Sequence, residues 1–201
     1  MTDTQIFSGG FPEPVFAAQA VFRVVMNCMA RPGTIGGIAA NANPPEPLTC
    51  AAGAVALTLC DHDTFVWLTP QLAKSKLPGW LAFHTGATVT AEKQDASFAF
   101  IEKGGVVPGF GVFSQGTQEY PDRSTTLVIE IDSFEGGRPL VLTGPGIRDE
   151  MRFAPKGLPE AFLSLAQANR ALFPRGVDLI LLAGDDIVCL PRTTVIRNGE
   201  A

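Results

Sequence analysis

One stretch decides the fold of this chain: Val177-Asp178-Leu179-Ile180-Leu181-Leu182-Ala183-Gly184-Asp185-Asp186-Ile187-Val188-Cys189-Leu190. Its first half, 177–183, is almost continuously apolar, which is typical of a strand in a sheet that is covered on both faces. Gly184-Asp185-Asp186 predicts a turn, because glycine and aspartate favour tight reversals. The turn leads into a second apolar strand, 187–190.

Outward from this stretch, strands alternate with helices along the chain. β-Branched and apolar runs predict further strands at Thr64–Leu68, Ser97–Ile101, Thr125–Ile131, Pro139–Thr143 and Thr193–Arg197. Start and stop signals predict helices from Pro14 to Arg31-Pro32-Gly33, from the cap Thr49 to Asp61, around Leu81–Phe83, and over Leu158–Phe173. The glycine-rich segment 104–117 predicts a loop with a short strand at Val112-Phe113. The sum predicts an α/β fold, a three-layer α/β/α domain with a mixed sheet.

Two of the predicted helices have opposite hydrophobic patterns. In the first helix, six apolar residues recur at helical spacing and predict one buried stripe: Val15, Ala18, Phe22, Val25, Met26 and Met29. The helix that follows Thr49 is apolar on nearly every face, so we expect it to be buried all round. In the last helix, the inner side is predicted to carry Phe162, Leu165, Ala166, Asn169 and either Leu172 or Phe173.

The composition bounds the class of protein. The chain has 201 residues, which suits a single domain, 1–201, with 1–12 as a flexible N-terminal segment. Hydrophobic residues make up 46% and charged residues 17%, a combination that excludes intrinsic disorder. The net charge of −5 argues against a nucleic-acid or membrane-surface partner held by bulk electrostatics.

Neither the N-terminus nor any apolar run indicates export or a membrane span. No basic segment precedes an apolar run at the N-terminus, and the longest apolar stretch, Ala51–Cys60, is too short to cross a bilayer. We therefore expect a cytoplasmic protein. The four cysteines lie in apolar contexts without C-x-x-C spacing, so we expect reduced, buried thiols and no metal site: Cys28, Cys50, Cys60 and Cys189.

Four segments carry candidate anion-binding groups. Gly144-Pro145-Gly146 follows a strand and could cradle phosphate with backbone N–H groups, but Pro145 lacks one, and a tight turn with positive φ at a glycine is the better interpretation. Tyr120 and Arg123 lie beside hydroxyls at the start of a strand, where a solvated loop is the alternative. Arg31 and Arg192 could contact the same anion or a partner chain. The alternative for Arg31 is a favourable interaction with the helix dipole, and the alternative for Arg192 is a plain surface arginine. Asp61-His62-Asp63 is best interpreted as a cap and turn.

Together the segments resemble one family. The motifs Phe22-Arg23-x-x-Met26-x-x-Met29-Ala30-Arg31-Pro32-Gly33, Tyr120-Pro121-x-x-Ser124-x-Thr126-Leu127, Leu142-Thr143-Gly144-Pro145-Gly146-Ile147, Phe173-Pro174-x-Gly176-Val177-Asp178 and Leu190-Pro191-Arg192-Thr193-Thr194 resemble the PhnH family of the bacterial carbon–phosphorus (C–P) lyase system. The resemblance runs from about residue 10 to about residue 197 and rests on the combination and order of the motifs.

The resemblance implies a fold similar to the large domain of pyridoxal-phosphate (PLP)-dependent transferases, without PLP. It implies a subunit that works with PhnG, PhnI and PhnJ when an alkylphosphonate is coupled to the ribose of ATP with release of adenine. We expect no cofactor, because none of the five lysines lies on a recognisable PLP motif. We also expect no catalytic residue in the chain alone, and a homodimer when partners are absent.

Within this reading, six residues are candidates for contact with a phosphonate or nucleotide ligand or with a partner subunit: Arg31, Tyr120, Arg123, Gly144, Gly146 and Arg192. Two alternatives stay open. One is a stand-alone enzyme that acts on a small phosphorylated metabolite. The other is a pure assembly scaffold, in which the same arginines only hold subunits together.

Overall fold

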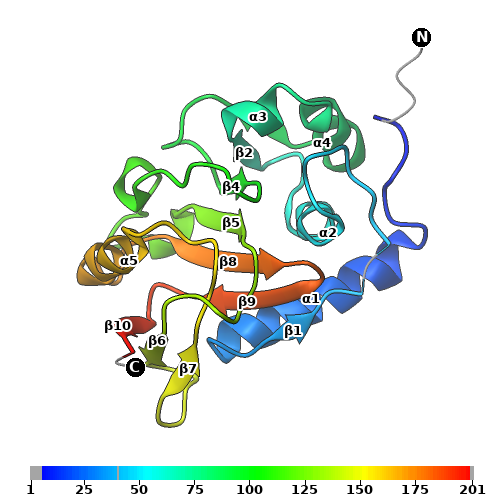
Figure 1. Ribbon diagram of the computed structural model, residues 1–201. Helices are drawn as coiled ribbons and strands as arrows, with labels where there is room; N and C mark the ends of the chain where they lie inside the picture. Colours follow the sequence, from blue (N-terminus) through cyan, green and yellow to red (C-terminus); the bar gives the residue numbers. More distant parts are fainter. Residues whose placement is uncertain (1–5, 40, 200–201) are drawn as a thin grey trace.

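A seven-stranded mixed sheet forms the centre of the computed structural model, which describes residues 6–39 and 41–199 (Figure 1). The order across the sheet is β1-β9-β8-β5-β4-β2-β3. The strands span Gly36–Gly37 (β1), Phe65–Leu68 (β2), Thr88–Thr90 (β3), Phe98–Ile101 (β4), Thr126–Glu130 (β5), Asp178–Ala183 (β8) and Asp186–Leu190 (β9). β3, β2, β4, β5 and β8 pair in parallel, whereas β9 is antiparallel to both β8 and β1. The predicted α/β class with a mixed sheet is confirmed.

Helices cover one face of this sheet, and a helix and a small sheet cover the other. The first face packs on α1 (Pro14–Ala30), α2 (Cys50–Leu59) and α4 (Leu77–Thr85), with the one-turn α3 (Pro70–Ala73) beside them. The second face packs on α5 (Phe162–Ala171) and on an antiparallel sheet of order β10-β6-β7. That sheet consists of β6 (Leu140–Thr143), β7 (Met151–Phe153) and β10 (Val195–Asn198). The second covering layer is therefore partly β-structure.

The central hairpin shows why both faces must be covered. In β8, Ile180 and Leu182 belong to the core on the α1–α2 side, whereas Leu179 and Leu181 belong to the core on the α5 side. Successive side chains of a strand point to opposite faces of the sheet. A strand whose odd-numbered and even-numbered residues are both apolar therefore needs a covering layer on each face. The continuous apolar run quoted first in the sequence is thus the chemical cause of the layered fold.

The all-apolar helix is confirmed. Residues 51–56 of α2 are buried, and the helix begins where expected, with the Thr49 hydroxyl accepting the N–H of Ala52 at 3.3 Å. This contact satisfies one of the N–H groups that a helix start leaves without an internal partner.

The apolar stripe predicted for α1 is only partly buried. The side chains that enter the core are Val21, Val25 and Cys28, with Val24 and Met29 half-buried. Val15, Phe22 and Met26 are 66%, 47% and 55% exposed. Helical spacing alone cannot choose between two adjacent apolar stripes, and the sheet packs on only one of them. α1 therefore presents a second apolar stripe to solvent.

Three local predictions need correction. Val112-Phe113 is not a strand: residues 110–112 form the short 3-10 helix η1 (Phe110–Val112), because the rings of Phe110 and Phe113 enter the second core. The strands β1, β3 and β7 were not foreseen; β1 consists of two glycines that pair with β9 through backbone alone. α5 begins at Phe162 rather than at Leu158. Of the two alternatives for its last inner residue, Leu172 is half-buried and Phe173 is exposed.

The segment before α1 makes specific contacts. The Ser8 carbonyl accepts the indole N–H of Trp80 at 2.9 Å, and Phe7 packs edge-on against Phe83. Residues 1–5 of the predicted flexible segment lie outside the described residues. Within the described ranges, no helix is both long and apolar enough to cross a membrane.

Candidate functional site

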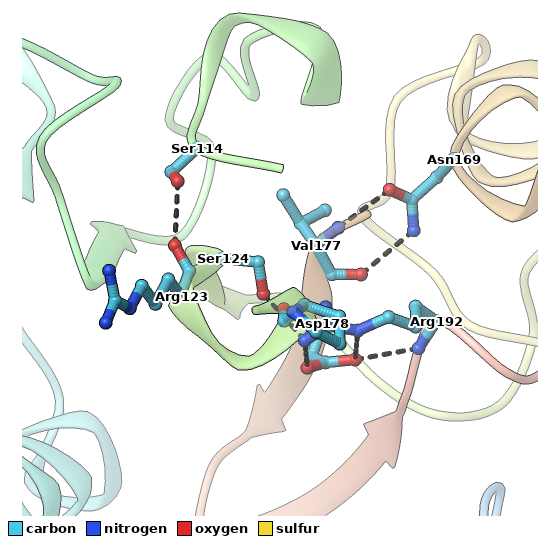
Figure 2. Close-up of polar contacts among 8 residues, drawn as sticks. Ser114, Arg123, Ser124, Asn169, Val177, Asp178 and Arg192 are labelled. Atoms are coloured by element: carbon cyan, nitrogen blue, oxygen red, sulfur yellow. Dashed lines mark hydrogen bonds and ion pairs between the residues drawn. The ribbon is translucent and has the colours of Figure 1, made fainter. Parts of the chain in front are cut away.

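Arg192 lies at the centre of an ion-pair cluster (Figure 2). Its Nε donates to Asp178 Oδ1 at 3.1 Å and its Nη2 donates to Ser124 Oγ at 2.6 Å. Further contacts join its guanidinium to Asp178 Oδ2 and to the Pro121 carbonyl. The Arg192 and Asp178 side chains are only 12% and 20% exposed. Most of the guanidinium donors are therefore used within the chain, and Arg192 clamps the end of β9 to the starts of β5 and β8.

A second polar contact holds the start of β8. The Asn169 side chain on α5 donates Nδ2–H to the Val177 carbonyl at 2.9 Å and accepts the Val177 N–H at 2.8 Å (Figure 2). Asn169 is buried, so this pair of bonds satisfies the backbone N–H and carbonyl of Val177 inside the protein. The predicted inner position of Asn169 is confirmed, and its role is to bind backbone.

Tyr120 and Arg123 lie beside the Arg192 clamp, but their side chains, unlike that of Arg192, are exposed. Tyr120 precedes the short 3-10 helix η2 (Pro121–Arg123) and Arg123 ends it, and the guanidinium carbon of Arg123 lies 4.3 Å from the centre of the Tyr120 ring. Ser114 Oγ donates to the Arg123 carbonyl at 2.8 Å and fixes the backbone of this turn (Figure 2). Nearby, Arg170 stacks on Phe173 in the same way at 4.7 Å. Each of the two exposed rings, Tyr120 and Phe173, is thus stacked against an arginine guanidinium.

The glycine turn makes close backbone approaches. Gly144 and Gly146 have φ of +131° and +84°. A Cβ on Gly146 would lie 2.1 Å from the Ala30 carbonyl oxygen, and one on Gly144 would lie 3.0 Å from that of Thr193. The turn therefore fits between the end of α1 and the residue after Arg192. Arg31, at the end of α1, is exposed and donates to Asn27 Oδ1 at 2.9 Å.

These contacts connect all six predicted residues along one side of the molecule. Gly146 lies against the Ala30 carbonyl and the Pro32 ring, on either side of Arg31. Gly144 lies against Thr193, the residue after Arg192, and Arg192 binds the turn that carries Tyr120 and Arg123. This side is the amino edge of the parallel strands, where β5 and β8 begin. Ligands of open α/β sheets bind outside the carboxyl ends. We call this surface the amino edge. Because it lies at the opposite end of the strands from the usual ligand crevice, its position argues against a catalytic site there.

The carboxyl edge carries groups that the sequence reasoning missed. Glu102 and Glu130 each follow or end a parallel strand, in β4 and β5, and both are 4% exposed. The register pairs Ile101 with Ile129, so the two carboxyl groups are neighbours on the α2 side of the sheet. Glu130 accepts the Thr49 N–H at 2.8 Å, the Thr49 hydroxyl at 2.7 Å and the Lys103 N–H at 3.2 Å. Glu102 accepts the Thr69 hydroxyl.

Burial raises the pKa of the Glu130 carboxyl above its ordinary value, and the nearby Glu102 adds to this effect, whereas hydrogen bonds from Thr49 and Lys103 oppose it. A glutamate placed directly after an apolar strand was the signal available in the sequence. It was overlooked because each glutamate occurs in a different segment, and only the sheet brings the two together.

We expect Glu130→Gln to change how stability depends on pH. Because the folded pKa is raised, the contribution of Glu130 is most favourable below its unfolded pKa of about 4.3 and is lost as pH rises through the folded pKa. The variant lacks this loss, so its free energy of unfolding should gain on that of the wild type as the pH rises from about 4 through the folded pKa of Glu130. Urea denaturation across that range measures the difference. Glu119→Gln, at an exposed position, is the control; an unchanged difference for Glu130→Gln would contradict the assignment.

Two other sequence expectations can be placed. Asp61 Oδ1 accepts the Asp63 N–H at 3.0 Å and the Thr64 hydroxyl at 2.8 Å, which confirms the cap and turn. Three thiols are buried, but Cys50 at the start of α2 is exposed, so the expectation of four buried thiols is wrong there. Burial raises the pKa of the Cys60 thiol to about 12. Among the described residues, no group of three or more His, Cys, Asp or Glu side chains could hold a metal ion.

Comparison with known proteins gives this arrangement a context. A family model described as "Bacterial phosphonate metabolism protein (PhnH)" matches residues 9–197. The "Alpha-D-ribose 1-methylphosphonate 5-triphosphate synthase subunit PhnH" of Rhizobium meliloti (strain 1021) is 62% identical over 195 residues, 97% of this chain and 98% of the relative. The "Putative C-P lyase subunit protein HtxG" of Stutzerimonas stutzeri is 40% identical over 82 residues, 41% of this chain and 42% of the relative. The chain therefore belongs to the PhnH family of bacterial phosphonate metabolism proteins.

Proposed function

We propose that this chain is the PhnH subunit of an α-D-ribose 1-methylphosphonate 5-triphosphate synthase in the C–P lyase pathway. The observation that carries the proposal is the 62% identity to a relative of that name across 97% of the chain.

The chain acts as a non-catalytic member of the assembly, and its amino edge binds another subunit. Arg192, the most enclosed of the candidate arginines, is occupied by Asp178 and Ser124 and has little capacity left for a substrate. Tyr120 and Phe173 are 49% and 50% exposed and lie beside guanidinium groups. Exposed aromatic residues and arginines are the commonest energetic centres of protein interfaces. PhnG, PhnI and PhnJ are the partners that the family resemblance implies.

We expect Tyr120→Ala to weaken binding of the chain to its partner subunits by about 30-fold, the effect of losing a typical hot-spot side chain of about 2 kcal/mol. Arg123→Ala, which removes the cation above the same ring, should have an effect in the same direction. Native mass by size exclusion with light scattering, for the chain alone and co-expressed with PhnG, PhnI and PhnJ, measures assembly.

The matched control is Arg197→Ala, which removes an exposed arginine from β10. If neither Tyr120→Ala nor Arg123→Ala changes the complex, the amino edge is not the interface. If the wild-type chain ignores all three partners and turns over a phosphorylated metabolite alone, the subunit proposal fails and the stand-alone enzyme replaces it.

The finer points of the proposal concern the free chain. Without partners it forms a twofold homodimer, which the same light-scattering run detects; the exposed apolar stripe of Val15, Phe22 and Met26 supports self-association. Residues 1–201 form one domain with the fold of the PLP-transferase large domain, and the chain works without PLP. It acts in the cytoplasm, a reducing compartment that suits four free thiols.

A further inference from the structure

A cavity of about 560 Å³ lies beyond the carboxyl end of β5, between the approach to β6 and the first turn of α5. The backbone of Lys156 forms one of its walls, because Ser133 and Lys156 pair in a β-bridge and the Asp132 N–H donates to the Lys156 carbonyl at 2.9 Å. Gly157 lines both this cavity and a hollow of about 440 Å³ beside Lys103 and Asp132. The cavity thus lies at the edge where α/β sheets bind ligands, away from the amino edge.

The floor of this cavity, which we call the carboxyl-edge cavity, is apolar. Leu140 and Phe162 are 3% and 4% exposed and belong to the core beneath it. Leu158 and Leu163 are half-buried beside them. A volume of this size and an apolar lining are typical of sites for small organic molecules.

The rim of the cavity is cationic. Arg138 and Lys156 both line it, and both are exposed. Arg138 Nε donates to Asn198 Oδ1 at 2.9 Å, which anchors the guanidinium. Within residues 6–39 and 41–199, neither cation has a carboxylate in ion-pair contact, whereas Lys103 nearby is paired with Asp132 at 3.1 Å. Glu160 is the one acidic side chain among the residues that line the cavity.

We propose that the carboxyl-edge cavity binds an organic phosphonate or phosphate ester, with its organic group on Leu140, Phe162 and Leu163 and its oxyanion between Arg138 and Lys156. The choice of phosphorus oxyanion rests on the proposed function; the need for an anion with an apolar group rests on the cavity itself. Arginine binds such an oxyanion through two parallel N–H groups, and lysine adds a point charge.

The site is separate from the subunit interface. The cavity is built from the loop before β6, the segment after β7 and the start of α5. The interface proposed above is built from η2 and the turn that follows α5 at Phe173. A ligand at the carboxyl edge can therefore be bound while the amino edge is covered by a partner.

Isothermal titration of the purified chain tests the inference with four probes: phenylphosphonate, methylphosphonate, ATP and inorganic phosphate. We expect phenylphosphonate or ATP to bind at least about tenfold more tightly than inorganic phosphate, because only these place a ring on the apolar floor. The tighter of the two shows whether the natural ligand is a phosphonate or a nucleotide. Equal affinity for all four probes, or no binding of any, overturns the proposal.

Variants locate the binding. Arg138→Ala and Lys156→Ala should each weaken the preferred probe at least about tenfold, the effect of one charge-assisted hydrogen bond. Leu163→Asp should abolish binding by placing a carboxylate on the floor, and Glu160→Gln should tighten it about twofold by removing a like charge. Arg148→Ala is the matched control, since it removes an exposed arginine from the other end of the β6–β7 hairpin. A loss in Arg148→Ala equal to that in Arg138→Ala overturns the assignment.

The outcomes separate this inference from the proposed function. Arg138→Ala and Lys156→Ala chains that enter the complex with PhnG, PhnI and PhnJ but fail to bind the probe support both. A wild-type chain that joins the complex but binds no probe overturns only the cavity. A chain that binds phenylphosphonate and ignores the three subunits overturns only the proposed function.

Discussion

Arg192→Ala is expected to lower the free energy of unfolding by about 3 kcal/mol, because it leaves the enclosed carboxylate of Asp178 without its cation. The same change removes the donors to Ser124 and to the Pro121 carbonyl, so the start of β5 loses its tie to the end of β9. For a domain of this size, the midpoint of thermal unfolding should fall by about 6–12 °C. Calorimetry and urea denaturation measure the two quantities.

A double-mutant cycle distinguishes the ion pair from general disruption. Asp178→Asn removes the charge but keeps an acceptor for the Arg192 N–H, which is 2.8 Å from Asp178 Oδ1. The double variant should therefore be more stable than the sum of the two single changes implies. Arg197→Ala, at an exposed position of β10, is the control and should change stability by less than about 0.5 kcal/mol. Additivity of Arg192→Ala and Asp178→Asn would contradict the clamp.

Gly146→Ala is the second large effect we expect, a loss of about 3 kcal/mol. Two causes add: φ of +84° costs an L-residue about 1–2 kcal/mol, and the new methyl group would lie 2.1 Å from the Ala30 carbonyl oxygen. The end of α1 or the turn must move to relieve this overlap. Chemical denaturation of the purified variant measures the loss.

Gly184→Ala separates the two causes. Gly184, in the β8–β9 turn, has φ of +60°, and a Cβ there would meet nothing within 4 Å. It should lose only the conformational part, about 1 kcal/mol. If Gly146→Ala is no worse than Gly184→Ala, the glycine turn does not serve close packing, and the phosphate-cradle reading of Gly144-Pro145-Gly146 regains its place.

The central fold could be predicted from the sequence because its strands are continuously apolar, as expected for strands covered on both faces. The runs 177–183 and 187–190 contain the information for a strand, a turn and a strand covered on both faces, and β8 and β9 follow it closely. Periodicity was less informative for α1, where two apolar stripes lie side by side and tertiary packing chose one. β1 could not be predicted, because pairing with β9 rather than side-chain preference makes Gly36–Gly37 a strand.

The sequence suggested residues for the candidate site but contained no information on their geometry. The motifs identified Arg192 and Tyr120 as members of one set, and the structure connects them. Nothing in the sequence shows that Arg192 is enclosed by Asp178 whereas Tyr120 is exposed, since that difference arises from strands far apart in the chain. The same reason hid Glu102 and Glu130, which become neighbours only through the pairing of β4 with β5.

The two outermost strands of the large sheet limit how far the sheet can be extended by pairing with another chain. β1 is two residues long and β3 is three, so each border of the sheet offers few backbone groups for pairing with another chain. Long, flat borders are the usual template for runaway strand addition. The longer apolar strands β8 and β5 lie in the interior of the sheet, where both of their edges are already paired. Association with other chains then depends on side-chain surfaces, which can be selective.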